Sequence, residues 1–229
     1  MTIPAAGASA QSPSMLHGGR NMVHVVAGAT NPNCREMLAK MFRQRCDVFI
    51  KEKGWKLKSY NGLEFDDYDT AETIYLMQFD ARDNIIASMR MNPTDGPYML
   101  ADIFSSVCEA PIPRGRDVWE LTRGALSRNL RKSGTWGRMQ CAMLESALLW
   151  GATKATGFFT VDHIMKQMRV GLDVKPLGSP LLVDGEANVA AEFPFNTQTL
   201  ERLRSSYGIS GPAIEHIHLM PVPQKKVAA

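Results

Sequence analysis

The sequence predicts one mixed α/β domain in which helices cover a partly antiparallel sheet. Strand-like and helix-like segments alternate along the chain, and two of the strand-like segments, 73–79 and 85–91, are separated only by a short polar turn. The chain has 229 residues, of which 45% are hydrophobic and 21% are charged, so it can bury one substantial core. These observations favour a globular domain over a fibrous or disordered chain.

A strand, a helix and a long loop precede that hairpin. Residues 22–26 form a strand-like run. Apolar residues follow helical spacing over 33–51, and Asn31 or Asn33 can cap the start of this helix. Residues 52–69 have no steady period and are rich in Lys, Gly, Asn and Asp, which predicts a long loop. Loops of this kind in compact domains are usually functional.

The remainder of the chain alternates between helices and strands. The patterns predict a short helix at 99–107, a strand at 117–125, a long helix from 133–135 to about 155, a strand at 157–161, a short helix at 163–170, strands at 181–183 and 189–193, and a last helix at 197–206. No strand-like run precedes Gly-x-Gly-x-x-Gly or Gly-x-x-x-x-Gly-Lys, which argues against a dinucleotide or nucleoside-triphosphate fold.

Composition and charge limit the possible classes. Residues 1–21 are rich in Ala, Ser, Gly and Pro and lack the compact apolar segment of an export signal, so we expect a flexible extension, with Met22 as an alternative start. We expect the domain at 22–218 and a tail at 219–229. No apolar run approaches the ~20 residues of a membrane helix, and four scattered cysteines favour a reduced cytoplasm. A net charge of +3 falls short of a nucleic-acid-binding footprint.

Acidic and basic residues are spaced in an ordered series along the middle of the chain. The series comprises Glu64, Asp66, Asp69, Arg90, Glu120 and Arg123. A strand separates Arg90 from the loop acids, which allows a bidentate contact that holds the loop over the sheet. A solvated surface pair, worth ~0 to 1 kcal/mol, is the alternative. Spacing alone leaves a functional site and a scaffold evenly balanced.

The spacing of Glu120 and Arg123 sets a condition on any shared site. They lie three residues apart on a predicted strand, so their side chains point to opposite faces unless the strand bulges or turns. Gly124 permits such a turn. A separate pair, His216 and His218, shares one face of any strand, but no third ligand is identifiable nearby, so we predict no metal site.

Together with two further motifs, the series resembles the acyl-homoserine lactone synthases, or LuxI-type autoinducer synthases. The matching pieces are Arg45-x-x-x-Phe49, Trp55, Glu64-Phe65-Asp66-x-Tyr68-Asp69, Arg90-Met91-x-Pro93-Thr94 and Val118-x-Glu120-x-x-Arg123, with a looser match at Gly171-Leu172-Asp173-Val174 and Leu177-Gly178. Each piece is weak alone, but their order and intervals are specific. The resemblance covers roughly residues 22–218.

The resemblance implies a fold and a reaction. The fold is like that of the GNAT acyltransferases: a mixed, largely antiparallel twisted sheet flanked by helices, with splayed central strands that receive a phosphopantetheine arm. The substrates are S-adenosylmethionine and an acyl thioester on acyl carrier protein or coenzyme A, with no permanently bound cofactor. Acyl transfer to the amine is followed by lactonisation and release of methylthioadenosine, which makes a quorum-sensing signal.

The resemblance also assigns roles to residues of the charged series. It implies Glu120 as the base for the amine, with Asp66 as the second candidate, and Arg123 as a group that stabilises the oxyanion. Arg45, Phe49 and Trp55 form a lid over S-adenosylmethionine, in which the indole faces the sulfonium and the guanidinium takes the carboxylate. Asp69 and Arg90 belong mainly to the frame of this binding site.

Two further sets of residues are implied for the acyl donor. The basic set contacts the phosphopantetheine arm or an acidic carrier protein: Arg128, Arg131, Lys132 and Arg138. The second set lines the acyl pocket: Leu100, Phe104, Met143, Leu144, Phe159 and Thr160. The aromatic pair Phe158 and Phe159 suggests a shortened or unsubstituted acyl site, whereas Thr160 leaves a 3-oxo chain open.

Two other functions remain open at this point. A GNAT-type N-acyltransferase for another amine shares the fold, but has no reason to bind S-adenosylmethionine. A basic regulatory or nucleic-acid-binding module is disfavoured by the low and interspersed charge. We expect a monomeric cytoplasmic enzyme without a nucleic-acid or membrane partner, and the sequence leaves acyl length, 3-position oxidation and the acyl carrier undetermined.

Overall fold

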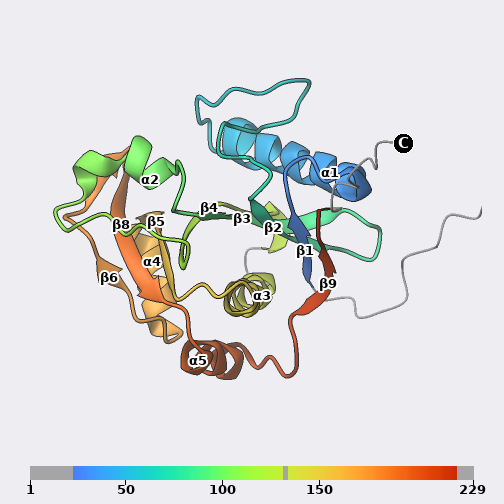
Figure 1. The fold of residues 1–229 in the computed structure, drawn as a ribbon. Coiled ribbons are helices and arrows are strands. Elements are labelled where there is room, and N and C mark those ends of the chain that lie inside the picture. The colour runs from blue at the N-terminus through green and yellow to red at the C-terminus, as the bar shows by residue number, and fades with distance from the viewer. Residues whose placement is uncertain (1–22, 131–133, 221–229) are drawn as a thin grey trace, which may run out of the picture.

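The computed structural model describes residues 23–130 and 134–220 (Figure 1). They form one mixed sheet with strands in the order β6-β8-β5-β4-β3-β2-β1-β9, and β7 pairs with β8. The neighbours are antiparallel except for β4 with β5 and β1 with β9. The strands are β1 (Val23–Ala27), β2 (Ile74–Phe79), β3 (Ile85–Pro93), β4 (Val118–Leu126), β5 (Lys154–Thr160), β6 (Lys175–Pro176), β7 (Leu181–Val183), β8 (Glu186–Pro194) and β9 (Ile214–His218). The predicted mixed, largely antiparallel sheet is confirmed.

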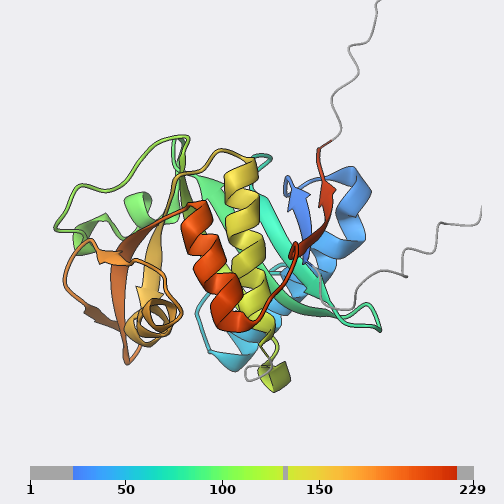
Figure 2. The same ribbon diagram turned by 90° about the horizontal axis from the view of Figure 1, so that it is seen from below.

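Helices cover both faces of this sheet. They are α1 (Arg35–Arg45), α2 (Met99–Asp102), α3 (Thr135–Leu149), α4 (Val161–Arg169) and α5 (Thr197–Tyr207), with π-helical residues Cys46–Glu52 and 3-10 turns at Pro32–Cys34, Ser105–Val107 and Arg128–Leu130. Figures 1 and 2 show α1 on one face, and α3 with α5 on the other. Strand β2 is buried on both faces because Tyr75 and Met77 pack toward α1 while Ile74 and Leu76 pack in the core under α3.

The centre of the sheet opens where β4 and β5 separate. These parallel strands pair only between Val118–Glu120 and Lys154–Thr156, although β4 continues to Leu126 and β5 to Thr160. The opposite edge of β4 stays paired with β3. The sheet is therefore split on one side of β4, which confirms the splayed central strands of the predicted GNAT-like fold.

Several element boundaries differ from the prediction. The long helix ends at Leu149 rather than near 155, because Gly151 adopts a left-handed conformation with φ of +71° and the amide of Ala152 bonds back to Ala147. Strand β5 then starts at Lys154. The sequence patterns also missed β6 and β9, which are short or largely exposed strands held at the two ends of the sheet.

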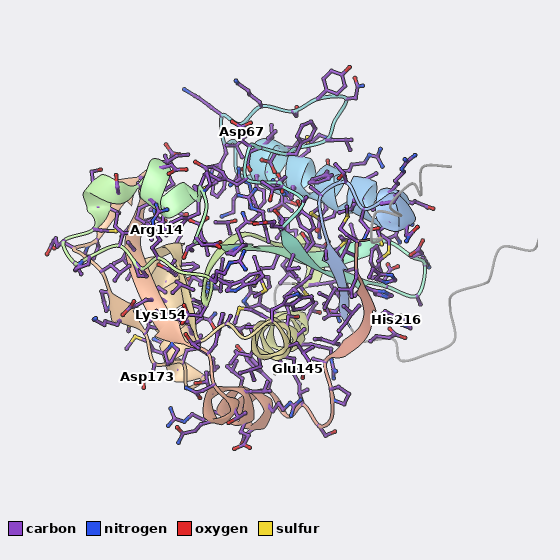
Figure 3. The ribbon with its side chains drawn as sticks, viewed as in Figure 1. Asp67, Arg114, Glu145, Lys154, Asp173 and His216 are labelled. Atoms are coloured by element: carbon purple, nitrogen blue, oxygen red, sulfur yellow. The ribbon has the colours of Figure 1, made fainter. Side chains whose placement is uncertain are left out.

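Strand β9 pairs with β1 in the sheet, and its start is also joined to α3. The carboxylate of Glu145 accepts hydrogen bonds from the amides of Ala213 and Ile214 at 2.9 and 3.1 Å, and pairs with Arg204 at 2.7 Å. Figure 3 shows Glu145 on α3 and His216 on the edge strand. This partly buried contact ties the start of β9 to the core helix, far from the split between β4 and β5.

Candidate active site

A buried ion network lies between α1, the following loop and the sheet. Arg45, at the end of α1, donates from Nε to Glu64 at 2.6 Å and from both Nη atoms to Asp69 at 2.8 and 3.0 Å. The three side chains expose 0, 1 and 2% of their surface. Tyr75 of β2 donates a further hydrogen bond to Asp69 at 2.8 Å. This arrangement fastens the loop to the sheet, since every oxygen that Arg45 uses belongs to the loop.

Arg90 extends the network along β3. Its Nη1 contacts both Asp66 and Asp69, the latter at 3.2 Å, and its Nε donates to Thr122 at 2.8 Å. The side chain is fully buried, and its Nη2 has no hydrogen-bond partner among residues 23–130 and 134–220. The predicted contact between Arg90 and the loop acids is therefore present as a buried interaction rather than a solvated surface pair.

The bend that Glu120 and Arg123 require is present in β4. Arg123 has φ of +52°, and the register between β3 and β4 shifts at this point, so β4 bulges. The Arg123 guanidinium contacts Glu64 at 3.1 Å and Asp66 at 2.8 Å. It also lies 5.8 Å from the centre of the Phe49 ring. The bulge thus turns Arg123 toward the same acids that Arg45 and Arg90 hold.

Glu120 is held differently from the other acids. Its carboxylate accepts hydrogen bonds from the backbone amides of Met99 at 3.0 Å and Leu100 at 2.6 Å. Burial raises its pKa to about 7, although the two amides and Arg90 act in the opposite direction. A buried carboxylate with a pKa near 7 can accept and release a proton near neutral pH.

A cleft of about 1580 Å³ runs past these residues and through the split between β4 and β5. Asp66, Glu120 and Arg123 line it, whereas Asp69 and Arg90 lie behind the lining. Figure 3 shows Asp67, another lining residue, on the loop beside α1. Of the charged series, only these three therefore face a space that a substrate can enter.

The lid residues divide into two groups. Phe49 and Trp55 stack with ring centres 5.0 Å apart, and Trp55 lines the cleft. Arg45, in contrast, has no exposed surface and is occupied by Glu64 and Asp69. Its predicted contact with a substrate carboxylate does not fit this geometry, because binding there would first have to break two buried ion pairs. Arg45 belongs to the frame.

The predicted acyl-pocket residues are also divided by the structure. Phe104 and Thr160 line the cleft, and their role in an acyl pocket stays a prediction. The other four do not line it, since they pack inside apolar clusters: Leu100, Met143, Leu144 and Phe159. Helix α3 turns Met143 and Leu144 toward the sheet, so the apolar pattern that suggested a pocket instead reflects the core.

The sequence also missed several cleft-lining residues. Met99, Trp136 and His163 line the cleft beside the bent strand, as does Phe158, which the sequence indicated only as part of an aromatic pair. Burial lowers the pKa of His163 to about 4, so this ring is neutral near pH 7. One signal in the sequence is Gly124, where an added Cβ would lie 2.9 Å from the Trp136 ring. A glycine in a strand indicates that another group approaches the backbone closely, but it does not show which residue that is.

Basic residues gather around the end of the cleft beyond β4 and β5. The lining includes Lys53, Lys56, Arg128, Lys166 and Arg169. Four basic residues were predicted to contact the acyl donor. Of these, Arg128 lines the cleft and Arg138 lies on α3 outside the lining. The other two, Arg131 and Lys132, fall outside the described residues. The lining also includes Asp162, which pairs with Lys166 at 2.6 Å, so an anionic group would be bound mainly by the other basic side chains.

The two histidines of β9 lie next to His24 of β1. The ring centre of His24 is 5.2 Å from that of His216 and 5.7 Å from that of His218. Burial and the neighbouring His216 lower the pKa of His24 to about 4. Over residues 23–130 and 134–220, no group of three or more His, Cys, Asp or Glu side chains is placed to hold a metal ion.

Comparison with known proteins identifies the family. Residues 30–203 match the sequence model described as autoinducer synthase. The chain belongs to this family. The autoinducer synthase is 31% identical to an acyl-homoserine-lactone synthase of Pseudomonas aeruginosa over 80% of this chain and 92% of that protein. It is 27% identical to the isovaleryl-homoserine lactone synthase of Bradyrhizobium diazoefficiens, over 82% and 86%.

Solved structures agree with this family and with the fold. This autoinducer synthase superposes on a coenzyme A-dependent acyl-homoserine lactone synthase, BjaI, solved with S-adenosylmethionine and isopentyl-CoA. The TM-score is 0.79 at 26% identity, covering 85% of this chain and 92% of that one. An acyl-CoA N-acyltransferase from Pseudomonas aeruginosa, 16% identical with a TM-score of 0.52, covers 74% and 97% and shares the fold. None of the helices in the described residues is long and apolar enough to cross a membrane.

Proposed function

We propose that this protein is an acyl-homoserine lactone synthase that acylates the amine of S-adenosylmethionine and releases methylthioadenosine. The observation that carries the proposal is the position of Glu120, buried with a pKa raised to about 7 in the cleft between the splayed strands of an autoinducer synthase. The product is a diffusible quorum-sensing signal. An N-acyltransferase for another amine is the alternative that the experiment below distinguishes.

In the first half-reaction, Glu120 takes a proton from the substrate ammonium group. An α-amino group has a pKa of ~8, so this is a modest demand near neutral pH. The neutral nitrogen attacks the thioester carbon, an N–C bond forms and the C–S bond breaks. The nitrogen loses its second proton, and the departing thiolate takes up that proton and leaves as a thiol. Arg123, held by Glu64 and Asp66, stabilises the negative charge that develops on the carbonyl oxygen.

Asp66 is the less suitable base. Its two carboxylate oxygens are already engaged, Oδ1 by Arg90 and Oδ2 by Arg123 at 2.8 Å. If Asp66 took up a proton, both of these ion pairs would weaken. Glu120, in contrast, accepts hydrogen bonds from two backbone amides, so taking up a proton breaks no ion pair among the described residues. This difference supports Glu120 as the base and Asp66 as a positioning residue.

The second half-reaction closes the lactone ring. The carboxylate of the methionine-derived part attacks its own γ-carbon, an O–C bond forms, and the bond to the sulfonium breaks to release neutral methylthioadenosine. This step is intramolecular, so holding the substrate in a folded conformation supplies most of what it needs. Trp55 lines the cleft and offers an aromatic face to the sulfonium.

Coenzyme A is the acyl carrier that the cleft favours. The basic side chains at the end of the cleft suit the phosphates of a coenzyme, and BjaI is described as coenzyme A-dependent. We also propose a cytoplasmic enzyme, because both substrates are cytoplasmic metabolites and the four cysteines are free thiols. A monomeric state is a separate part of the proposal.

Turnover of purified protein tests the proposal. With S-adenosylmethionine and a panel of acyl-CoA and acyl-carrier-protein donors, we expect methylthioadenosine and an acylated lactone in equal amounts, measured by mass spectrometry. Faster turnover with the carrier-protein donors would contradict the choice of coenzyme A as the acyl carrier, but not the proposed reaction. Acylation of another amine, with no methylthioadenosine from any donor, would instead identify an ordinary N-acyltransferase.

A further inference from the structure

Two phenylalanines form a ring stack on the α2 side of the cleft. Phe104 follows α2 and Phe158 lies on β5, and their ring centres are 4.7 Å apart with an interplanar angle of 28°. Both side chains are half-buried and both line the cleft. Met99 and Ile103, from α2 and its end, line the same region.

The stack separates the cleft from an apolar cluster behind it. The buried members of that cluster are Tyr98, Leu100, Leu177 and Ala190, each at most 2% exposed. Of the described residues that make up or pack against this cluster, Phe104 and Phe158 alone also line the cleft. The two rings are therefore a wall with substrate space on one side and packed core on the other.

The polarity of the cleft gives the direction in which an acyl chain runs. Arg128 follows the end of β4, and Lys166 and Arg169 lie on the helix that follows β5, so the phosphate-binding end is at the carboxyl ends of the splayed strands. Phe158 lies near that same end of β5, but its ring faces the α2 side, where it stacks on Phe104 beside Met99, whose amide donates to Glu120. A thioester with its phosphates among the basic side chains thus directs its acyl chain past Glu120 toward the α2 side of the cleft, where the Phe104–Phe158 stack lies.

We propose, on the basis of the function proposed above, that the Phe104–Phe158 stack ends the acyl site and restricts the donor to short acyl chains. A longer chain would have to move one of two stacked rings into a cluster that is already packed, because interiors at this density leave no free methylene-sized space. One methylene that a site cannot accommodate lowers kcat/KM by about 10- to 200-fold. The wall thus determines chain length, while Glu120 and Arg123 perform the same chemistry for any donor.

The test compares kcat/KM for acyl donors from butyryl to dodecanoyl, supplied both as coenzyme A and as carrier-protein thioesters. We expect the wild-type protein to prefer butyryl or hexanoyl over decanoyl donors by at least about 10-fold. In Phe158→Ala and Phe104→Ala, the ratio of kcat/KM for the decanoyl donor to kcat/KM for the butyryl donor should rise by a similar factor, because removal of a ring opens the wall. The ratio within one variant does not depend on how much of that variant is folded.

Phe159→Ala is the matched control, since Phe159 is the next residue of β5 but packs against Phe193 and His163 rather than lining the cleft. Its ratio should equal that of the wild type, and Phe158→Leu provides a milder variant if alanine prevents folding. A wild-type preference for decanoyl donors, or an unchanged ratio in both wall variants, overturns the inference while methylthioadenosine release still supports the proposed function. If none of the donors leads to release of methylthioadenosine, the proposed function fails instead.

Discussion

Arg45 and Glu120 are both almost fully buried charged side chains within one site, yet the protein holds them by different means. Arg45 is matched by two carboxylates, which use its Nε and both Nη atoms. In the described part of the chain, Glu120 forms no ion pair and is held by two backbone amides. The first arrangement keeps a charge permanently, whereas the second leaves a carboxylate that can gain or lose a proton. This contrast distinguishes the frame, made by Arg45, Glu64, Asp69 and Arg90, from the reacting group.

The largest effect is expected when the reacting group loses its ability to take a proton. Glu120→Gln should lower turnover by about 100- to 10,000-fold while the protein stays folded, because one acid–base group contributes about that factor. Methylthioadenosine release measures turnover, and circular dichroism and the thermal midpoint report folding. Glu109→Gln, an exposed carboxylate after α2, is the control and should leave both unchanged. Near-normal turnover in a folded Glu120→Gln protein would transfer the base role to Asp66 or to water.

Breaking the frame should instead affect stability first. Arg45→Met leaves the buried Glu64 and Asp69 short of a partner, and removal of one member of a buried pair costs about 3 to 5 kcal/mol in the free energy of unfolding. Urea-induced unfolding measures this change. Lys51→Met, which removes an exposed pair with Asp47, should leave the midpoint unchanged. An Arg45→Met protein of normal stability with a raised KM for S-adenosylmethionine would restore Arg45 as a substrate ligand.

The pH dependence of the rate should report Glu120. Only its deprotonated form can accept a proton, so with a pKa of about 7 the rate at saturating substrates should rise about 10-fold per pH unit below 7 and level off above it. The inflection should disappear in Glu120→Gln. A plateau extending well below pH 6 in the wild-type protein would exclude Glu120 as the base.

The free energy of unfolding should depend on pH in opposite directions for Glu120 and for the frame residue Asp69. Burial raises the pKa of Glu120 to about 7, so its contribution to stability is present at low pH and is lost as pH rises to 7. For Asp69, burial acts upward but Arg45 and Arg90 outweigh it and lower the pKa to about 2. Its contribution is present above about pH 4 and is lost as pH falls toward 2. Unfolding free energies of Glu120→Gln and Asp69→Asn across this range check both signs.

The smallest effect is expected at the lid. Trp55→Ala should raise KM for S-adenosylmethionine by about 2- to 30-fold with little change in kcat, since a ring facing a cation contributes ~0.5 to 2 kcal/mol. Trp55→Phe should retain most of the affinity. Tyr60→Ala, an exposed aromatic in the same loop, is the control. Equal KM values for all three variants would show that Trp55 only packs against Phe49.

Much of the site was predictable because its residues lie in short motifs with fixed spacing. The ordered acids and guanidiniums, the hairpin that carries Arg90 and the aromatic lid were all apparent before the structure. For Arg45 the motif left the partner open, since a motif records which residue is present but not whether its partner is a substrate or a neighbouring loop. The acyl residues of α3 were misassigned for a related reason: an apolar face looks the same whether it meets a ligand or a sheet.

The sequence by itself determined the family, the fold class and the set of charged residues, because local patterning and motif order need no knowledge of distant contacts. Tertiary structure decided which of those residues react. The bulge with Arg123 at φ of +52°, and the position of Phe158 rather than Phe159 on the cleft, depend on how β4 pairs with β3 and separates from β5. Burial, which raises the pKa of Glu120, likewise exists only after α2 and β4 have packed together. Strand pairing and desolvation are properties of the folded chain, so no spacing in the sequence reports them.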